Sequence, residues 1–339
     1  MASGRDVVVV AASAGGLQPL CAMLSQLPAG LPAAVLVVMH VPATGGSSLP
    51  RILDRAGPLP AAAAVNGERL RLGRVYVAPP DKHMLVVKDT VRLSRGPRQN
   101  GVRPAADPLF RSAALHAGPR VIGVVLSGTM DDAALGSATV ERRGGRVIVQ
   151  DPDDADYDSM PCSAFSATEH AEIVPTWRLA KQLIRLVMEE VDMPLADTSD
   201  PDEELVSEIG GLLTGTLKTN TESRTHSEFT CPECGGPLYR ATEEHAETYD
   251  CLVGHRWAPE TLFEEQSAAL ERALWLAIRS LEERGRLTTR LAEAARGRGH
   301  AASAEQFAQA AAEAQDSADA IRSVASGMTA EVAAKSQQA

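Results

Sequence analysis

Three polar side chains that could act together each follow a short apolar run: Ser13, His40 and an aspartate at position 131 or 132. A serine hydroxyl becomes a nucleophile when a neighbouring imidazole takes its proton, and a buried carboxylate then fixes the tautomer of that imidazole. These side chains could fill the three roles in that order. They are therefore a candidate catalytic triad of nucleophile, base and orienting acid, with either aspartate eligible.

The residues after Ser13 suit the same chemistry. Gly15 and Gly16 allow a tight turn, and the helix expected after them offers free backbone N–H groups to a developing oxyanion. Each pattern has an alternative explanation: Ser-x-Gly-Gly often marks a phosphate-holding or plain turn, a single histidine is often structural, and Asp131 could cap the next helix. Their coincidence at three strand ends favours catalysis.

The elements that must position these residues alternate in type. From Asp6 to about Gln150, short β-branched runs, glycine-bearing loops and helical stretches repeat, which predicts parallel strands joined by helices. The strands are almost wholly apolar, as in a sheet covered on both faces. Such strands end at one edge, where distant residues can meet. The expected strands are Val7–Ala11, Ala34–Met39, Val75–Ala78, Val121–Leu126 and Arg146–Gln150; the expected helices are Leu17–Gln26, Leu49–Ala56, Leu109–His116, Ala133–Arg142 and Trp177–Val191; Met84–Leu93 is expected to form a hairpin.

Several motifs in this part of the chain resemble the CheB-type chemotaxis protein-glutamate methylesterase domain, over about residues 5–190. They occur in the family's order and are VVAASAGG at 9–16, VMHVP at 38–42, GRVYVAPPDKH at 73–83, RPAADPLFRSAA at 103–114, LSGTMDDA at 126–133 and MP at 160–161. The resemblance implies a doubly wound, mostly parallel α/β esterase domain that needs no cofactor for catalysis. It also implies that Asp132, the second aspartate of the pair, is the orienting acid.

The resemblance further implies a substrate and a set of site residues. Members of the family release methanol from glutamyl methyl esters of chemoreceptors, and some deamidate glutamines by the same acyl-enzyme route. A methylated chemoreceptor or similar signalling protein is therefore the expected partner. Alternatives are an esterase for another ester and a catalytically silent signalling scaffold. The implied site residues are Ser13, His40 and Asp132 for catalysis, and Ala14, Gly15 and Thr129 for the oxyanion and substrate.

The chain departs from the family pattern at a few positions. Ala11 and Ala133 stand where the family usually or often has glycine, and Val102 stands where it has histidine. None of these departures removes a residue of the triad. The best-known members carry an N-terminal receiver domain, and we expect this chain to be a member without one. Two further matching residues have simpler roles: His83 is expected to be structural, and Asp107 to cap the helix at Leu109.

A second group of residues has the spacing of a metal site. Cys231-x2-Cys234 is followed after sixteen residues by Cys251-x3-His255. Thiolates and imidazoles are the ligands of structural Zn²⁺, and two glycines directly after Cys234 suit a tight turn there. We therefore predict a zinc-ribbon-like module with a closed, structural zinc site; unrelated reduced thiols or a redox pair are the alternatives.

Composition sets the organisation and excludes some partners. Phe307 to Ala325 carries an apolar seam with spacings of three and four, which suits the packing of one helix on another. The helical stretch with Leu270, Leu274, Ile278 and Leu281 is expected to dock on a partner, on the esterase cleft or on a second subunit; the alternative is a helical hairpin that packs only on itself. A net charge of −11 argues against nucleic acid, and no apolar run approaches the roughly 18 residues of a membrane span. Five cysteines are too few for a disulfide scaffold, which favours the cytoplasm.

The sequence thus divides into five expected segments. They are a catalytic domain (1–191), an acidic linker (192–228), the zinc-ribbon-like module (229–257), a helical region (258–326) and a disordered tail (327–339).

Overall fold

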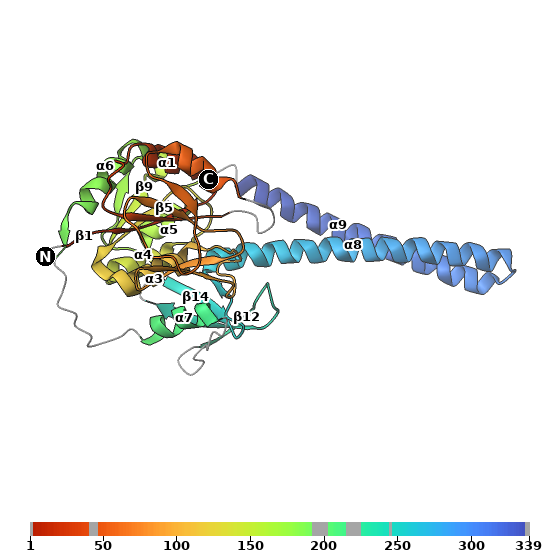
Figure 1. Ribbon diagram of the computed structural model, residues 1–339. Helices are drawn as coiled ribbons and strands as arrows, with labels where there is room; N and C mark the ends of the chain where they lie inside the picture. The colour runs from red at the N-terminus through yellow and green to blue at the C-terminus, as the bar shows by residue number, and fades with distance from the viewer. Residues whose placement is uncertain (1–2, 41–46, 192–202, 215–224, 244–245, 336–339) are drawn as a thin grey trace. The chain divides into compact units, whose positions relative to one another are not determined.

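The computed structural model describes residues 3–40, 47–191, 203–214, 225–243 and 246–335 (Figure 1). These residues form two compact units, Met1–Leu262 and Phe263–Ala339. The first unit contains the predicted esterase domain and the cysteine-bearing module, and the second is helical.

A seven-stranded sheet lies at the centre of the first unit, and all of its strands are parallel. The predicted doubly wound α/β fold is confirmed, and all of the predicted strands are present. The two strands that the sequence did not indicate, β4 and β10, are only three residues long. In order across the sheet the strands are β10 (Glu172–Val174), β9 (Arg146–Gln150), β8 (Val121–Val125), β2 (Val7–Ala12), β3 (Ala34–Met39), β5 (Arg74–Val77) and β4 (Ala61–Ala63).

Helices cover both faces of this sheet, because successive side chains of a strand point to opposite sides. In β2, Val7, Val9 and Ala11 pack into one apolar cluster, whereas Val8, Val10 and Ala12 pack into the other. The first face also carries the predicted hairpin, β6 (His83–Val87) with β7 (Thr90–Ser94), which forms a separate antiparallel sheet. Its helices are α3 (Ala106–Ala117), α4 (Ala134–Arg142) and α5 (Ser159–Ser166), and those of the second face are α1 (Leu17–Ser25), α2 (Leu49–Ala56) and α6 (Thr176–Val187) (Figure 1).

Smaller elements complete the domain. Strand β1 (Ser3–Gly4) pairs with β11 (Glu190–Val191) and so ties the start of the domain to its end. Two 3₁₀ turns, η1 (Gly118–Arg120) and η2 (Pro152–Asp154), lead into β8 and follow β9.

The winding of the sheet changes direction beside β2. From β2 the chain passes to β3 and onward to one edge of the sheet, and it later returns to β8 on the other side of β2. In open α/β sheets the crevice at such a point, outside the carboxyl ends of the strands, is where ligands bind. Ser13 follows β2, His40 follows β3, and residues 127–132 follow β8. The three predicted strand ends are therefore neighbours.

A helix inside the predicted acidic segment packs on this domain. Helix α7 (Glu203–Thr214) contributes buried leucine and isoleucine side chains to a cluster with Leu85 of β6. Its Glu208 lies 2.7 Å from the guanidinium of Arg111 on α3 and 2.9 Å from that of Arg256. Arg111 is almost wholly buried, so α7 supplies a charge that the interior of the first unit requires.

The cysteine-bearing module is a four-stranded antiparallel sheet with a small core. Its buried apolar residues are Cys231, Leu238, Cys251, Trp257 and Leu262. Two of these are predicted metal ligands, so little apolar surface remains to hold the sheet together. We call residues 225–262 the ribbon. Its strands, in order, are β12 (Thr225–Thr230), β13 (Pro237–Glu243), β14 (Ala246–Cys251) and β15 (Arg256–Trp257).

Two long helices form the second unit. Helix α8 (Pro259–Gly297) enters it at Phe263 and is joined by a short turn to α9 (Ala301–Lys335), and the two lie side by side (Figure 1). An ion pair between Glu282 and Arg322 links them. Ala314, Ala318 and Ala325 of the predicted seam are buried, as expected. Residues 327–335 of the expected tail belong to α9, and 336–339 lie outside the described residues.

Several large apolar side chains of α8 are exposed, among them Trp275, Leu276 and Leu287. Docking of this hairpin on a partner or on a second copy stays a prediction. None of the helices that the structure describes combines the length and apolar character needed to cross a bilayer.

Candidate active site

The turn after β2 places Ser13 at the carboxyl end of the sheet, beside the loop that follows β8. The backbone N–H of Ser13 donates to the carbonyl of Ser127 at 3.0 Å, which joins the end of β2 to the loop after β8. Gly15 has φ +71°, and a Cβ there would lie 2.6 Å from Oγ of Ser127. The turn therefore needs glycine at this position, both for its backbone conformation and for its contact with the second loop.

The three predicted catalytic side chains are connected by hydrogen bonds. Oγ of Ser13 lies 3.0 Å from Nδ1 of His40, and Nε2 of His40 lies 2.8 Å from Oδ2 of Asp132. Ser13 is 9% exposed, His40 is partly buried, and Asp132 is 1% exposed. With Nε2–H donating to the carboxylate, Nδ1 is free to accept the proton of the serine hydroxyl. Of the two candidate aspartates, Asp132 is the one that reaches the histidine.

The carboxylate of Asp132 is held by backbone as well as by His40. The N–H groups of Ala106 and Asp107, at the start of α3, donate to its two oxygens at 2.6 and 3.2 Å. Burial by itself would raise the pKa of Asp132, but the hydrogen bonds from His40 and from these backbone groups lower it below its usual value. The carboxylate is therefore ionised and oriented before any substrate arrives.

The loop between β8 and α4 has an unusual backbone. Gly128 lies against Ser13 and Met160, and a Cβ there would come within 2.8 Å of Cβ of Ser13. Met130 and Ala133 have φ of +67° and +81°, in the left-handed region that residues with a side chain rarely adopt. An alanine at position 133 therefore costs roughly 1 kcal/mol, which a glycine would not. The strained positions flank Asp131 and Asp132.

Two backbone N–H groups are available beside the serine. Ala14 follows Ser13 in the turn, and Thr129 lies in the loop whose Ser127 carbonyl holds the Ser13 backbone. Among the residues that the structure describes, neither of these N–H groups donates a hydrogen bond. Free N–H groups at this edge are what an oxyanion site requires.

The role expected for Asp107 is wrong. Helix α3 begins at Ala106, so Asp107 lies in its first turn and does not cap it. Its carboxyl group instead accepts a hydrogen bond from the N–H of Gly136 on α4, at 2.7 Å. Burial, and then the nearby charge of Asp132, raise the pKa of Asp107 well above its usual value. A neutral Asp107 therefore joins α3 to α4 beneath the ionised Asp132.

His83 has the structural role that we expected. It is wholly buried, its Nε2–H donates to the carbonyl of Pro97 at 3.0 Å, and its Nδ1 accepts from the N–H of Ala105 at 3.2 Å. Burial lowers its pKa to about 4, so it stays neutral. Its hydrogen bond with Ala105 fixes the backbone directly before Ala106 and Asp107, whose N–H groups donate to the carboxylate of Asp132.

Asp131 faces away from His40 and toward the ribbon. Its carboxyl group accepts a hydrogen bond from the hydroxyl of Thr261, which is 0% exposed. Burial raises the pKa of Asp131 to about 6, although the Thr261 hydroxyl acts in the opposite direction. Nothing in the sequence pattern indicated this pair, because its members are far apart in the chain.

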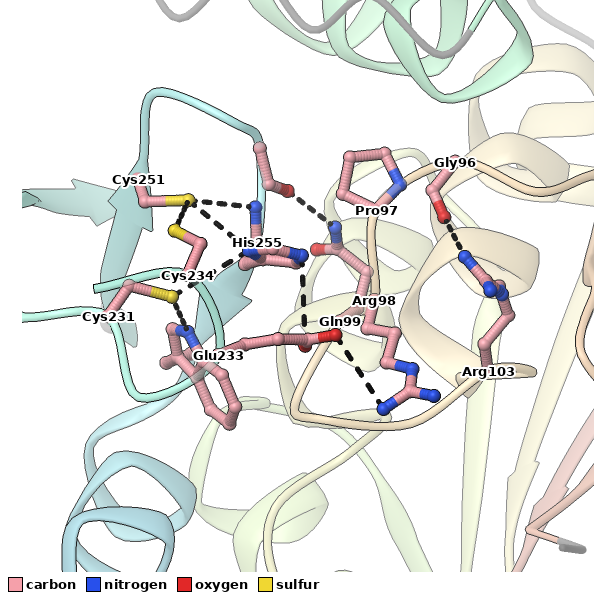
Figure 2. A network of polar contacts seen from close by, with 12 residues as sticks. Gly96, Pro97, Arg98, Gln99, Arg103, Cys231, Glu233, Cys234, Cys251 and His255 are labelled. Carbon is pink, nitrogen blue, oxygen red and sulfur yellow. Dashed lines mark hydrogen bonds and ion pairs between the residues drawn. The ribbon is translucent and has the colours of Figure 1, made fainter. Parts of the chain in front are cut away.

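The predicted metal ligands meet at one point of the ribbon. One ligand atom from each of Cys231, Cys234, Cys251 and His255 lies within 4.8 Å of all the others (Figure 2). Sγ of Cys234 and of Cys251 are 3.6 Å apart, and Nδ1 of His255 is 3.5 Å from Sγ of Cys251. Around a tetrahedral zinc with bonds of about 2.3 Å, neighbouring ligand atoms are about 3.8 Å apart, so the cluster fits such an ion.

Both ends of the cluster have the backbone of a metal-binding turn. Gly235 and Gly254 have φ of +70° and +97°, and their N–H groups donate to the carbonyls of Cys231 and Cys251. On the far side of the imidazole, Nε2 of His255 lies 3.7 Å from Glu233, where a carboxylate can orient a metal-bound histidine (Figure 2). The structure thus contains a Cys/His cluster suited to a metal.

A serine, a histidine and a buried aspartate linked in this order are the arrangement of serine hydrolases. The family model described as CheB methylesterase matches residues 8–183, which is more than half of the chain. The chain belongs to the CheB methylesterase family, as its motifs indicated. The match ends before α7, the ribbon and the helical hairpin.

Related proteins and a solved structure agree with this family assignment. Protein-glutamate methylesterase/protein-glutamine glutaminase 3 of Anaeromyxobacter dehalogenans is 43% identical over 163 residues, which are 48% of each chain. Protein-glutamate methylesterase/protein-glutamine glutaminase 2 of Methanosarcina mazei is 36% identical over 193 residues, 55% of this chain and 53% of that one. The Thermotoga maritima CheB methylesterase catalytic domain superposes with a TM-score of 0.51 and 32% identity, over 55% of this chain and 100% of that one. The chain thus spans about half the length of the curated relatives it matches.

The raised pKa of Asp131 predicts a pH dependence of folding stability. The carboxyl binds its proton more tightly in the folded chain, with a pKa of about 6 against an ordinary 3.8. The folded protein therefore carries extra protons between these values, and its stability falls as the pH rises through this window. A shift of about two units corresponds to about 3 kcal/mol. Asp131→Asn keeps the acceptor for Thr261 but cannot titrate. The folding stability of this variant should therefore fall less than that of the parent as the pH rises.

Urea unfolding at pH 4 to 7 measures this difference. Asp158, an exposed aspartate, provides the matched control, and Asp158→Asn should follow the parent. An equal fall in the parent and in Asp131→Asn would show that Asp131 does not cause it.

Proposed function

We propose that this chain is a protein-glutamate methylesterase that hydrolyses glutamate methyl esters on chemoreceptor-like proteins through an acyl-enzyme. The observation that carries the proposal is the pair of hydrogen bonds from Ser13 to His40 and from His40 to Asp132, at 3.0 and 2.8 Å. Membership of the CheB methylesterase family and the printed names of the relatives support the substrate.

In the first half of the reaction Oγ of Ser13 attacks the ester carbonyl carbon while Nδ1 of His40 takes the hydroxyl proton. The carbonyl oxygen gains the negative charge, and the N–H groups of Ala14 and Thr129 are the proposed donors to it, with Gly15 shaping the turn between them and the helix. His40 then gives its proton to the departing methoxide oxygen, and methanol leaves. A glutamyl ester of Ser13 remains.

In the second half water replaces methanol. His40 takes a proton from the water as its oxygen attacks the acyl carbon, and then returns a proton to Oγ of Ser13. The products are the free glutamate side chain and the original enzyme. Throughout, the ionised Asp132 stabilises the imidazolium and keeps Nδ1 of His40 directed at the serine. The site residues need no cofactor for these steps.

Glutamine deamidation is a second activity that the same site supports. The relatives carry the name protein-glutamine glutaminase as well as protein-glutamate methylesterase. The chemistry differs only in the leaving group, because His40 would protonate the amide nitrogen and release ammonia. The acyl-enzyme is the same.

We further propose that the ribbon holds one structural zinc ion through Cys231, Cys234, Cys251 and His255. Three thiolates and one imidazole complete a tetrahedron, so no position is left for a reacting water. The ion would stabilise a sheet whose own apolar core is small. We also propose a cytoplasmic location, because five cysteines in a chain of this length are too few for a disulfide scaffold.

Removal of the serine hydroxyl should abolish the proposed activity. Ser13→Ala removes the nucleophile without changing the fold, so methanol release from methylated receptor fragments should fall on the order of 10⁴-fold or more. A coupled alcohol assay measures it. Ser25→Ala, an exposed serine of α1, is the control and should match the parent. Comparable release by Ser13→Ala would contradict the proposal.

Metal binding by the ribbon can be tested separately. The purified chain should bind one equivalent of zinc, and replacement by Co²⁺ should give the absorption bands of a tetrahedral thiolate complex. Cys234→Ser should lose the metal, whereas Cys21→Ser, in α1, should keep it. An octahedral cobalt spectrum, or unchanged zinc in Cys234→Ser, would refute the four-ligand site.

A further inference from the structure

A tight turn of the esterase domain contacts the ribbon on either side of a metal ligand. The turn is residues 99–102, and the side-chain amide of Gln99 donates to the carbonyl of Gly254 at 3.2 Å (Figure 2). The N–H of Asn100 donates to the carbonyl of Arg256 at 2.8 Å. Gly254 and Arg256 are the neighbours of His255, so the turn is bonded to the backbone that carries this ligand.

Two more contacts strengthen this junction. The side-chain oxygen of Asn100 accepts from the N–H of Ala258 at 2.9 Å. Glu233, between the two cysteines of the first pair, lies 3.6 Å from the guanidinium of Arg98 and 3.7 Å from the imidazole of His255 (Figure 2). The turn itself is closed by two backbone hydrogen bonds between Gln99 and Val102.

The same stretch of chain leads directly to the donors of Asp132. Arg103 follows the turn, and its guanidinium donates to the carbonyl of Gly96 at 2.8 Å (Figure 2). The same guanidinium also donates to the carboxylate of Asp81. His83 then fixes the N–H of Ala105, and the next two N–H groups hold the carboxylate. Displacement of the turn would therefore move the donors that hold Asp132.

Asp132 is connected to the ribbon from its other side as well. Its neighbour Asp131 accepts a hydrogen bond from Thr261, which follows β15 by four residues. Both the loop that carries Asp132 and the segment that binds its oxygens thus contact the ribbon. Between these contacts a cavity of about 360 Å³ separates Asp107 and Asp131 on one side from Thr248 and Arg256 on the other, so hydrogen bonds and ion pairs at its edge join the two parts there.

Hydrogen bonds of this kind depend on the exact course of the ribbon backbone, and the ribbon has little core of its own. Two of its five buried apolar residues, Cys231 and Cys251, are metal ligands. A sheet this small usually folds only with its metal bound. The backbone at Gly254 and Arg256 should therefore be ordered when the cluster is loaded and lose its order when the cluster is empty.

We propose that the metal-loaded ribbon is a positioning element of the esterase: zinc in the cluster keeps the ribbon groups that bind Gln99, Asn100 and Asp131 in place, and these contacts fix the two segments that position Asp132. The inference rests on the proposed function. The turnover of the esterase then depends on zinc, although the zinc ion takes no part in the chemical steps.

The test compares the full chain loaded with zinc and stripped of it by a chelator, with zinc content measured by a chromogenic dye. Loss of zinc should lower kcat for methyl ester hydrolysis by at least about tenfold, since small displacements near a catalytic group have effects of this size. KM should change less than about twofold, because the substrate contacts are untouched. Added zinc should restore kcat.

Asp132→Asn identifies the route of the effect. If the ribbon acts through Asp132, removal of zinc from Asp132→Asn should cause no further loss of its residual turnover. A tenfold loss in this variant too would mean that zinc acts elsewhere, and would overturn the inference.

A second pair of variants avoids any unfolding of the ribbon. Thr261→Val removes the hydroxyl bound to Asp131 and keeps the side-chain shape, whereas Thr261→Ser keeps the hydroxyl. Thr261→Val should retain its zinc and lose about tenfold in kcat, and Thr261→Ser should stay within about twofold of the parent. Equal kcat in both variants, or in zinc-loaded and zinc-free chain, would overturn the inference. A zinc-loaded parent without turnover would instead overturn the proposed function.

Discussion

The candidate site depends on one buried negative charge, the carboxylate of Asp132. An ionised carboxylate removed from water is costly unless hydrogen bonds replace its hydration. Here His40 and the N–H groups of Ala106 and Asp107 do so. This requirement explains why the loop after β8 accepts strained backbone conformations, and why the neighbouring Asp107 is held in its neutral form. The hydrogen bond from Nε2 of His40 to this carboxylate also directs Nδ1 of His40 toward Ser13.

The same requirement connects parts of the chain that belong to no common motif. The start of α3 supplies the donors, and α3 is in turn joined to α7 and the ribbon through buried charges, since Glu208 contacts both Arg111 and Arg256. Asp250 of the ribbon pairs with the same Arg256. Breaking one member of such a buried group usually costs several kcal/mol. The ribbon and α7 are thus part of the folded body that contains the site, although the family match stops before them.

The sequence revealed most of the fold because the strands are short apolar runs bounded by glycine-bearing loops, and it revealed Ser13 and His40 because each follows such a run. It did not distinguish Asp131 from Asp132, since both follow β8; the family resemblance did. The partners of Asp107 and Asp131 were not predictable, because Gly136 and Thr261 reach them only through the tertiary fold. Strand β4 and helix α5 were missed because Ala61–Ala63 and Ser159–Ser166 are short and lack a clear apolar period.

The central claim is that Asp132 and His40 activate Ser13. A fluorophosphonate probe reacts with an activated serine, so mass spectrometry of the labelled peptides, with the rate of labelling, tests the claim directly. The account predicts that Ser13 of the parent is modified, and that Asp132→Asn is modified at least about a hundredfold more slowly because His40 loses its orientation. Labelling of a different serine, or an unchanged rate in Asp132→Asn, would contradict it.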